Sequence, residues 1–121
     1  MALHNELGKQ GEKVVIELLR KSDYKILRHN WHFERYEIDI IAENEEWIIF
    51  VEVKTRASYQ WGNPEDAISK SKIKRIVEAA NFYLIQNNIS KSARFDVAAV
   101  IVKGNDFEIE YIEDAFLPPV N

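Results

Sequence analysis

The chain of 121 residues is 46% hydrophobic and 30% charged, a composition typical of one soluble globular domain. It contains no cysteine, which excludes disulfides and thiolate metal sites and fits a reducing compartment. No signal peptide is predicted, and no apolar run approaches the roughly 20 residues needed to span a membrane. We therefore expect one cytoplasmic domain over residues 1–121, with a core of 1–116 and a tail of 117–121.

The net charge of −4 at first argues against a nucleic-acid partner, but the acidic residues are unevenly distributed. Residues 104–121 hold five acids and no lysine or arginine, and residues 1–103 hold 15 acids and 16 bases. Local patches govern binding more than the total charge does. Charge alone therefore neither predicts nor excludes nucleic acid.

Residues 4–21 are predicted to form an amphipathic helix. Its apolar stripe consists of Leu3, Leu7, Val14, Val15 and Leu18. Gly8 and Gly11 are poor helix formers, which predicts a close backbone approach to a neighbouring element. Glu12 borders the apolar stripe, and the residues alone favour a boundary glutamate paired with a lysine.

A strand is predicted next, over residues 24–31. His29 and His32 are three positions apart and would face opposite sides of this strand if it continues. Neither has a partner at helical ligand spacing, so a histidine zinc site is not expected.

The most informative stretch is residues 36–56, YEIDIIAENEEWIIFVEVKTR, which predicts two strands around an acidic turn at 43–46. The first strand carries Asp39, and the second ends in Glu52-Val53-Lys54. Both faces of the second strand are apolar, so we expect a central strand covered on both sides. Charged groups at the end of such a strand are costly unless they pair or bind an ion.

The register of this hairpin decides whether its charged groups meet. If the turn holds an even number of residues, Asp39 lies opposite Phe50 or Glu52, and Lys54 shares the face of Glu52. An odd turn would separate Asp39 from the other two side chains. The shared face is therefore a hypothesis about register.

A second helix has two candidate starts, one at Asn63-Pro64 and one at Ser69, and it is predicted to end at Asn87-Asn88. Basic residues gather just after Ser69, where the helix dipole disfavours cations. They are Lys70, Lys72, Lys74 and Arg75. Backbone N–H groups and cations at a helix start suit phosphates, and this interpretation is slightly favoured over a solvated basic face.

Two further strands are predicted, a buried one at 94–102 and an edge strand at 107–112 with one wet face. Asp96 is assigned to capping or a local ion pair rather than to the site, and Phe116 is expected to pack on the body. The element order α-β-β-β-α-β-β predicts a single mixed α/β domain.

An acid on one strand, a short turn and Glu-x-Lys on the next, with a glutamate on a preceding helix, resembles the PD-(D/E)xK nuclease superfamily. The match is closer to the YraN-type family of small bacterial proteins predicted to be endonucleases, which is distantly similar to archaeal Holliday junction resolvases. The residues that carry the resemblance are Gly8, Gly11-Glu12, Tyr24, Ile26-Leu27, Asn30-Trp31, Glu37-Ile38-Asp39, Phe50 to Arg56, Gly62, Pro64, Lys72, Tyr83-Leu84 and Arg94 to Val97. Tyr36 departs from that family, which usually has glycine there, and the larger side chain is expected to narrow access beside Asp39.

The resemblance implies a restriction-endonuclease-like fold, a central mixed sheet flanked by helices, and Mg²⁺-dependent cleavage of structured DNA, with Mn²⁺ as a substitute. The implied metal ligands are the carboxylates of Asp39 and Glu52, the Val53 carbonyl, and Glu12 as an outer or second-metal ligand. Lys54 would orient the water or offset developing charge. The expected phosphate contacts are Arg56, Lys70, Lys72, Lys74 and Arg75.

Three hypotheses follow for the function. The first is a Mg²⁺-dependent deoxyribonuclease, for which a homodimer is one expectation because a resolvase needs two sites. The second is a non-catalytic nucleic-acid-binding module on the same fold, which the overall acidity keeps open. The third is a protein-interaction subunit whose acidic edge strand docks a partner and whose Glu-x-Lys is a structural ion pair. The intact acid–acid–lysine set favours the first over the third.

Overall fold

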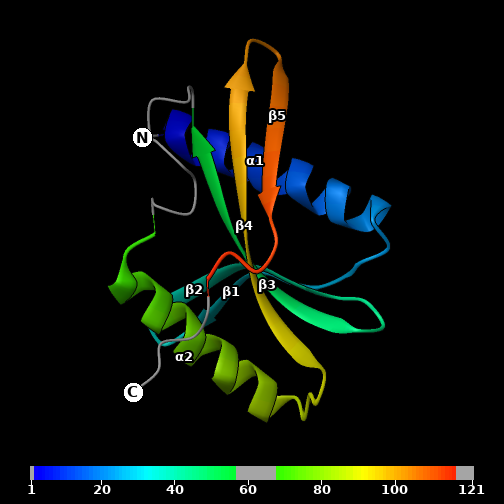
Figure 1. The fold of residues 1–121 in the computed structure, drawn as a ribbon. Helices are drawn as coiled ribbons and strands as arrows, with labels where there is room; N and C mark the ends of the chain where they lie inside the picture. Colours follow the sequence, from blue (N-terminus) through cyan, green and yellow to red (C-terminus); the bar gives the residue numbers. More distant parts are fainter. Residues whose placement is uncertain (1, 57–67, 117–121) are drawn as a thin grey trace.

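The structure, a computed structural model, describes residues 2–56 and 68–116, with side chains described from residue 6 onward (Figure 1). The elements are α1 (Ala2–Lys21), β1 (Lys25–Phe33), β2 (Tyr36–Glu43), β3 (Trp47–Arg56), α2 (Lys70–Gln86), β4 (Ser92–Lys103) and β5 (Asp106–Ile112). This sequence of elements confirms the predicted α/β fold. Within the described residues, no helix is both long and apolar enough to cross a membrane.

The five strands form one mixed sheet in the order β1-β2-β3-β4-β5. Only β3 and β4 run parallel, and α2 lies in the connection between them. The other neighbouring pairs are antiparallel. As predicted, β3 is the central strand, and β5 is an edge strand whose burial alternates along its length.

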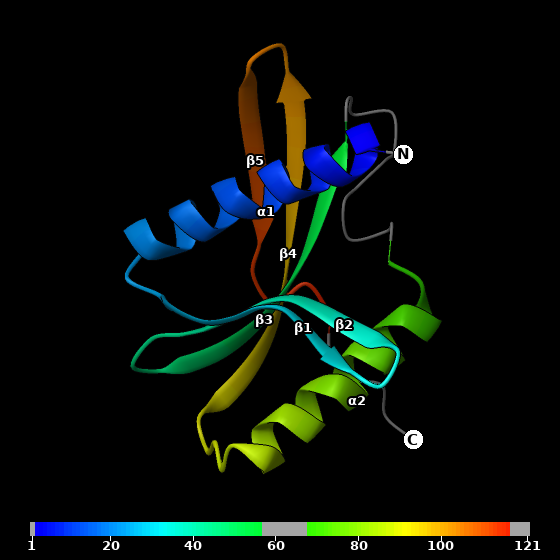
Figure 2. The ribbon, with the colours of Figure 1, turned by 180° about the vertical axis from the view of Figure 1, so that it is seen from behind.

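The two helices cover opposite faces of the sheet. α1 crosses behind the β4–β5 part of the sheet in Figure 1 and in front of it in Figure 2. On its face, Val15 and Leu19 pack with alternate strand residues such as Val51. On the other face, Ile76 and Tyr83 of α2 pack with residues that include Phe50. Successive residues of β3 thus enter different cores, which explains why the strand is apolar on both faces.

The helix ends match the sequence-based expectations where they are described. Ser69 caps α2, and its Oγ accepts a hydrogen bond from the Lys72 backbone N–H at 3.1 Å. Asn87 caps the other end of α2, and Asn88 follows with φ 53°. The alternative start at Asn63-Pro64 lies outside the described residues.

The two glycines of α1 have different surroundings. A Cβ on Gly11 would collide with the Thr55 side chain of β3, so the predicted close approach is confirmed at Gly11. In the part of the chain that the structure describes, no atom lies within 4 Å of a Cβ placed on Gly8, so no close approach is found at that position. The approach at Gly11 places the N-terminal half of α1 beside the end of β3.

The segment after β5 returns to the body of the protein. The Ala115 N–H donates to the Phe95 carbonyl at 2.8 Å, and the Phe116 ring stacks on Phe95 with centroids 5.3 Å apart. The predicted packing of Phe116 is therefore confirmed. The proposed tail, residues 117–121, lies outside the described residues.

Candidate active site

The β2–β3 hairpin brings Asp39 and Glu52 to the same place. The register Ile40↔Val51 and Ile41↔Phe50 has the parity that directs Asp39 toward Glu52. The ladder ends at Ile40↔Val51, and beyond it the Val53 N–H donates to Asp39 Oδ2 at 2.8 Å. Both carboxylates are nearly buried, with 8% and 7% of the residue surface exposed. Asp39 and Glu52 therefore share one face of the hairpin, as the sequence predicted for an even turn.

Two lysines approach the Glu52 carboxylate. Lys54 Nζ lies 3.7 Å from Glu52 Oε1, as expected for residues two apart on one strand face. Lys72 Nζ lies nearer to the same oxygen, at 2.7 Å. The closer partner of Glu52 thus comes from the first turn of α2 and not from the Glu-x-Lys motif itself.

The electrostatics of the site reflect this crowding. Burial and the neighbouring Glu52 carboxylate raise the pKa of Asp39 to about 7, although the Val53 N–H works in the opposite direction. Burial and the adjacent Lys72 ammonium lower the pKa of Lys54, against the attraction of Glu52. Burial also lowers the pKa of Lys72, but its contact with Glu52 outweighs this and leaves the pKa raised.

Glu12 reaches the site from α1 with a partner that the sequence did not predict. Its Oε1 lies 2.9 Å from His29 Nε2 on β1, so the expected pairing with a lysine is wrong. Glu12 adds to the negative potential that raises the pKa of Asp39, although burial and Glu52 contribute more. The helix–strand packing that Gly11 permits therefore places a third carboxylate at the edge of the site.

The carboxylates form the shared wall of two open hollows. The first, of about 320 Å³, extends toward the β1–β2 turn and is lined by Arg35, Tyr36, Glu37, Asp39, Glu52, Lys72, Arg75 and Ile76. The second, of about 310 Å³, extends toward α1 and the end of β3 and is lined by Leu7, Gly8, Glu12, Asp39, Glu52, Val53, Lys54, Thr55, Arg56 and Lys72. Because Asp39, Glu52 and Lys72 line both hollows, the two hollows adjoin at these side chains, and we refer to them together as the groove.

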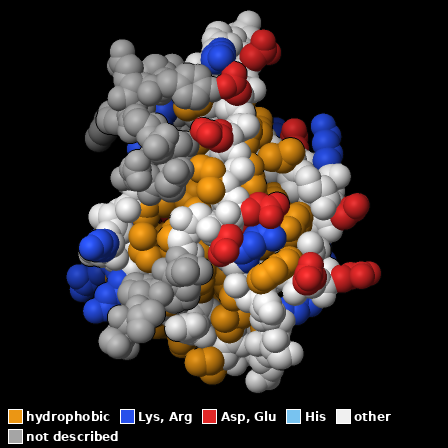
Figure 3. All heavy atoms as spheres, in the orientation of Figure 1, with side chains coloured by type: hydrophobic (Ala, Val, Ile, Leu, Met, Phe, Trp, Pro, Cys, Tyr) orange, Lys and Arg blue, Asp and Glu red, His pale blue; other side chains and the backbone are white. Residues whose placement is uncertain are grey.

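The predicted phosphate-binding residues differ in whether they line a hollow. Arg56 lines the second hollow, and Arg75 and Lys72 line the first. Lys70 and Lys74 are exposed on the first turns of α2 and line neither hollow. Lys and Arg side chains gather at the left edge of Figure 3, where Figure 1 shows the start of α2. The groove therefore has basic groups at both ends and an exposed basic surface beside one of them.

Sequence reasoning missed three groups at the groove. His29 was considered only as a zinc ligand, Arg35 only as part of a connection, and Tyr36 only as an obstruction. The side chains of Arg35 and Tyr36 line the first hollow, and His29 holds Glu12. The two-residue turn between β1 and β2 was the available signal, because it fixes Arg35 and Tyr36 next to the strand that bears Asp39.

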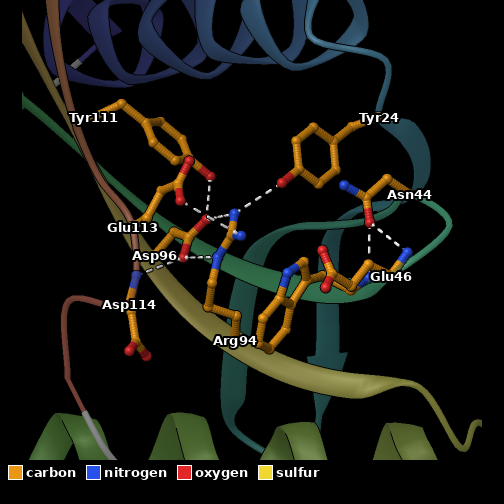
Figure 4. A network of polar contacts seen from close by, with 9 residues as sticks. Tyr24, Asn44, Glu46, Arg94, Asp96, Tyr111, Glu113 and Asp114 are labelled. Atoms are coloured by element: carbon orange, nitrogen blue, oxygen red, sulfur yellow. Dashed lines mark hydrogen bonds and ion pairs between the residues drawn. The ribbon is translucent and has the colours of Figure 1, made fainter.

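Asp96 belongs to a separate buried network (Figure 4). Its carboxylate accepts two hydrogen bonds from the Arg94 guanidinium, at 2.9 and 2.8 Å, and one from the Tyr111 hydroxyl at 2.6 Å. Tyr24 accepts another Arg94 hydrogen bond at 2.9 Å, and the Asp114 N–H donates to Asp96 at 3.0 Å. Burial and the Asp96 carboxylate raise the pKa of Tyr111. The expected local ion pair is confirmed, and it joins β4, β5 and the start of β1.

The donor set of the groove suits a hard cation. Among the described residues, no group of three or more His, Cys, Asp or Glu side chains is arranged as a metal-binding cluster. Two carboxylates and the Val53 carbonyl remain, and Mg²⁺ commonly binds through one or two carboxylates while keeping several waters. Burial and the neighbouring Glu52 carboxylate both disfavour the ionised form of Asp39, and a bound cation would favour it.

Comparisons with known proteins give the family. The model of the uncharacterised protein family UPF0102 matches residues 11–100. The chain belongs to the UPF0102 family. A UPF0102 protein of Flavobacterium psychrophilum is 47% identical over 116 residues, which cover 96% of this chain and 98% of that relative. UPF0102 proteins of Parabacteroides distasonis and Phocaeicola vulgatus are 45% and 42% identical, and each match covers at least 98% of both chains.

The UPF0102 match includes every candidate site residue of this chain, from Glu12 on α1 to Arg75 on α2. The names of the family and of these relatives state no activity. The groove is therefore the feature of this UPF0102 chain that indicates its function.

Proposed function

We propose that the protein is a metal-dependent endonuclease that hydrolyses phosphodiester bonds of structured DNA, in the manner of the PD-(D/E)xK nucleases. One observation carries the proposal. Two nearly buried carboxylates, Asp39 and Glu52, share the wall of an open groove with Lys54 and Lys72. A buried acid with a raised pKa in a cleft, as Asp39 is, favours a functional site over a structural ion pair.

The groove residues have distinct roles in this proposal. Asp39, Glu52 and the Val53 carbonyl hold the cation, which when bound neutralises phosphate charge and lowers the pKa of a bound water. Lys54, whose pKa is lowered by burial and by Lys72, orients the attacking water beside Glu52. Arg56, Lys72 and Arg75 contact the backbone phosphates on either side.

The reaction is a hydrolysis. A bond forms between the water oxygen and phosphorus, and the bond from phosphorus to one bridging oxygen breaks. The water loses a proton, and the leaving oxygen takes one up. Preorganised cations next to the phosphate stabilise the charge that develops in the transition state. Phosphate contacts carry no base information, so we expect cleavage that depends on DNA structure and not on sequence.

The test is cleavage of branched, flapped and single-stranded DNA with Mg²⁺ or Mn²⁺, comparing the wild type with Glu52→Ala and Lys54→Ala. We expect each substitution to lower the cleavage rate by at least about 100-fold, in the range typical of losing one electrostatic stabiliser. Glu45→Ala, in the exposed β2–β3 turn, is the matched control and should retain activity. Equal cleavage by all four proteins would indicate a contaminating nuclease.

A non-catalytic nucleic-acid-binding module is the second candidate. The contact between Lys72 and Glu52 supports it, because an ion pair of 2.7 Å already satisfies one carboxylate without a metal. Metal-independent DNA binding by a pure protein that cuts none of the substrates would favour this candidate over the nuclease.

A further inference from the structure

The first hollow has an aromatic side that the hydrolysis does not use. Tyr36 opens β2, pairs across the turn with Phe33 of β1, and lines the hollow together with Asp39 and Glu52. The Tyr36 and Phe33 rings are 6.4 Å apart at 45°. No hydrogen bond joins the Tyr36 hydroxyl to any described residue. A half-buried tyrosine whose hydroxyl bonds no described residue, at the wall of a polar hollow, has a ring face to offer a ligand.

The rings behind Tyr36 hold it in place. Phe33 stacks on Phe82 of α2 with centroids 4.1 Å apart, and Trp31 lies parallel to Phe33 at 6.4 Å. Trp31 in turn makes an edge contact with the buried Tyr83 at 5.2 Å. The aromatic row therefore runs from the α2-side core to the hollow, and it presents a ring backed by rigid neighbours.

The charges around this ring favour a nucleotide over another aromatic or apolar ligand. Arg35 and Arg75 line the same hollow as Tyr36, and both are exposed. Among the described residues, Arg75 bonds only within its own helix, to the Ser71 carbonyl and Oγ, each at 3.4 Å, and no acidic side chain pairs with Arg35. A nucleobase can stack on an aromatic ring, and the neighbouring phosphates bind to cationic side chains. This wall of the hollow offers both kinds of group.

We infer that Tyr36, with Arg35 and Arg75, forms a subsite for one unpaired nucleobase next to the phosphate that lies over Asp39 and Glu52. The inference depends on the proposed function, because the position of that phosphate follows from it. Bases in a continuous duplex are already stacked on both faces, whereas unpaired bases are free to stack on a protein ring. The subsite therefore selects DNA with unpaired nucleotides at the cleavage position, such as flaps, junction arms or single strands, over intact duplex.

The experiment measures binding without cleavage, so it does not depend on catalysis. Single-stranded, flapped and blunt duplex DNA are titrated in EDTA, and single strands containing 2-aminopurine report stacking by loss of fluorescence. Tyr36→Leu keeps the apolar bulk and removes the π face, and Tyr36→Phe keeps the ring. Ile85→Ala, at the exposed end of α2 away from the hollow, is the control.

We expect Tyr36→Leu to bind single-stranded and flapped DNA roughly 5- to 100-fold more weakly, because stacking on a protein ring contributes that much per base. Its affinity for blunt duplex should change by less than about twofold, since that binding depends on phosphate contacts. Tyr36→Phe and Ile85→Ala should behave like the wild type. The 2-aminopurine fluorescence should fall with the wild type and with Tyr36→Phe but not with Tyr36→Leu.

Two outcomes would overturn the subsite. One is equal weakening of single-stranded and duplex binding by Tyr36→Leu, and the other is unchanged binding and unchanged quenching. A cleavage assay on the same proteins tests the proposed function independently of the subsite. A wild type that quenches 2-aminopurine but cuts nothing keeps the subsite and rejects the nuclease. A wild type that cuts, with the same substrate preference in Tyr36→Leu, keeps the nuclease and rejects the subsite.

Discussion

Lys72 Nζ lies 2.7 Å from Glu52 Oε1, and Lys54 Nζ lies 3.7 Å from the same oxygen. The ammonium from α2 therefore occupies one side of the carboxylate that we propose as a metal ligand. Ser69 fixes this arrangement, because its cap holds the first turn of α2 where Lys72 projects toward β3. A cation bound as proposed would compete with Lys72 for Glu52, and a DNA phosphate that attracts Lys72 would free the carboxylate.

This competition predicts that Lys72→Gln strengthens the binding of Mn²⁺ and weakens the binding of DNA. Affinity for Mn²⁺ without DNA should rise by about 2- to 5-fold, since an ion pair whose lysine side chain is 38% exposed contributes about 1 kcal/mol. Affinity for DNA should fall, and its salt dependence should decrease by about one phosphate contact. Calorimetric Mn²⁺ titration and DNA titration at several salt concentrations measure the two effects.

Lys70→Gln is the matched control, because Lys70 lies on the same turn, is exposed, and does not contact Glu52. It should lower DNA affinity slightly and leave Mn²⁺ affinity unchanged. Weaker Mn²⁺ binding by Lys72→Gln would mean that Lys72 positions Glu52 for the cation instead of competing with it.

The raised pKa of Asp39 predicts that the stability of the protein depends on pH. The folded-state pKa of Asp39 is raised to about 7 from an ordinary value of 3.8. Below pH 3.8 both the folded and the unfolded state carry the proton, so burial of Asp39 imposes no charge penalty. As the pH rises toward 7, the unfolded state ionises first and the folded state loses stability relative to it.

Asp39→Asn removes this titration and keeps an oxygen for the Val53 N–H. In EDTA at about pH 8, we expect the variant to exceed the wild type in free energy of unfolding by roughly 1–3 kcal/mol. At about pH 4 the two should be nearly equal. Urea unfolding at both pH values measures the difference. A variant less stable than the wild type at about pH 8 would contradict the prediction, because the Asp39 charge would then be stabilising.

The shared face of Asp39 and Glu52 was predictable because it depends on local geometry. Strand alternation and turn parity fix which side chains meet across a hairpin, whatever the rest of the fold does. The caps at Ser69 and Asn87 were readable for the same reason, since each involves neighbours within one helical turn. These features required no knowledge of how the helices pack.

The partners of Glu12 and Glu52 were not predictable from the residues. Glu12 contacts His29 only because α1 lies close to the sheet at Gly11, and Lys72 reaches Glu52 only because α2 packs on the opposite face. Both contacts lie beyond the reach of one turn or hairpin, since they join residues 17 and 20 positions apart on different elements, and many surface lysines could have satisfied either carboxylate equally well. The sequence predicted that Asp39, Glu52 and Lys54 share one face, and tertiary packing decided which groups pair with them.

The close approach of α1 to Thr55 at Gly11 predicts that a shift of α1 would disturb the site. Gly11→Ala introduces a Cβ that collides with the Thr55 side chain, so α1 must shift or the Thr55 rotamer must change. We expect a loss of stability of about 1–3 kcal/mol, typical of overpacking, and slower DNA cleavage because Glu12 moves with the helix. Gly8→Ala is the control, since nothing lies within 4 Å of the added Cβ. It should be neutral or stabilising by up to about 1 kcal/mol, the helix propensity gain of alanine over glycine.

Thermal unfolding and cleavage rates of the two alanine variants distinguish these expectations. Gly11→Ala combined with Thr55→Ala should recover part of the lost stability, because the second substitution removes the colliding atoms. Equal behaviour of Gly8→Ala and Gly11→Ala would show that the close approach of α1 has no energetic consequence.

The buried Arg94–Asp96 pair predicts a large effect on stability that leaves the groove intact. Arg94 and Asp96 are 7% and 0% exposed, and neither lines the two hollows. Asp96→Ala leaves the guanidinium buried without its carboxylate, which typically costs about 3–5 kcal/mol. Glu108→Ala, which removes an exposed ion pair with Lys103, should cost less than about 1 kcal/mol. Urea unfolding measures both free energies, and the DNA affinity of the folded fraction should equal that of the wild type.

A folded Asp96→Ala protein that has lost DNA binding would contradict this prediction and place Asp96 in the functional site. Asp96→Asn, which keeps the shape and one acceptor, would separate that role from misfolding.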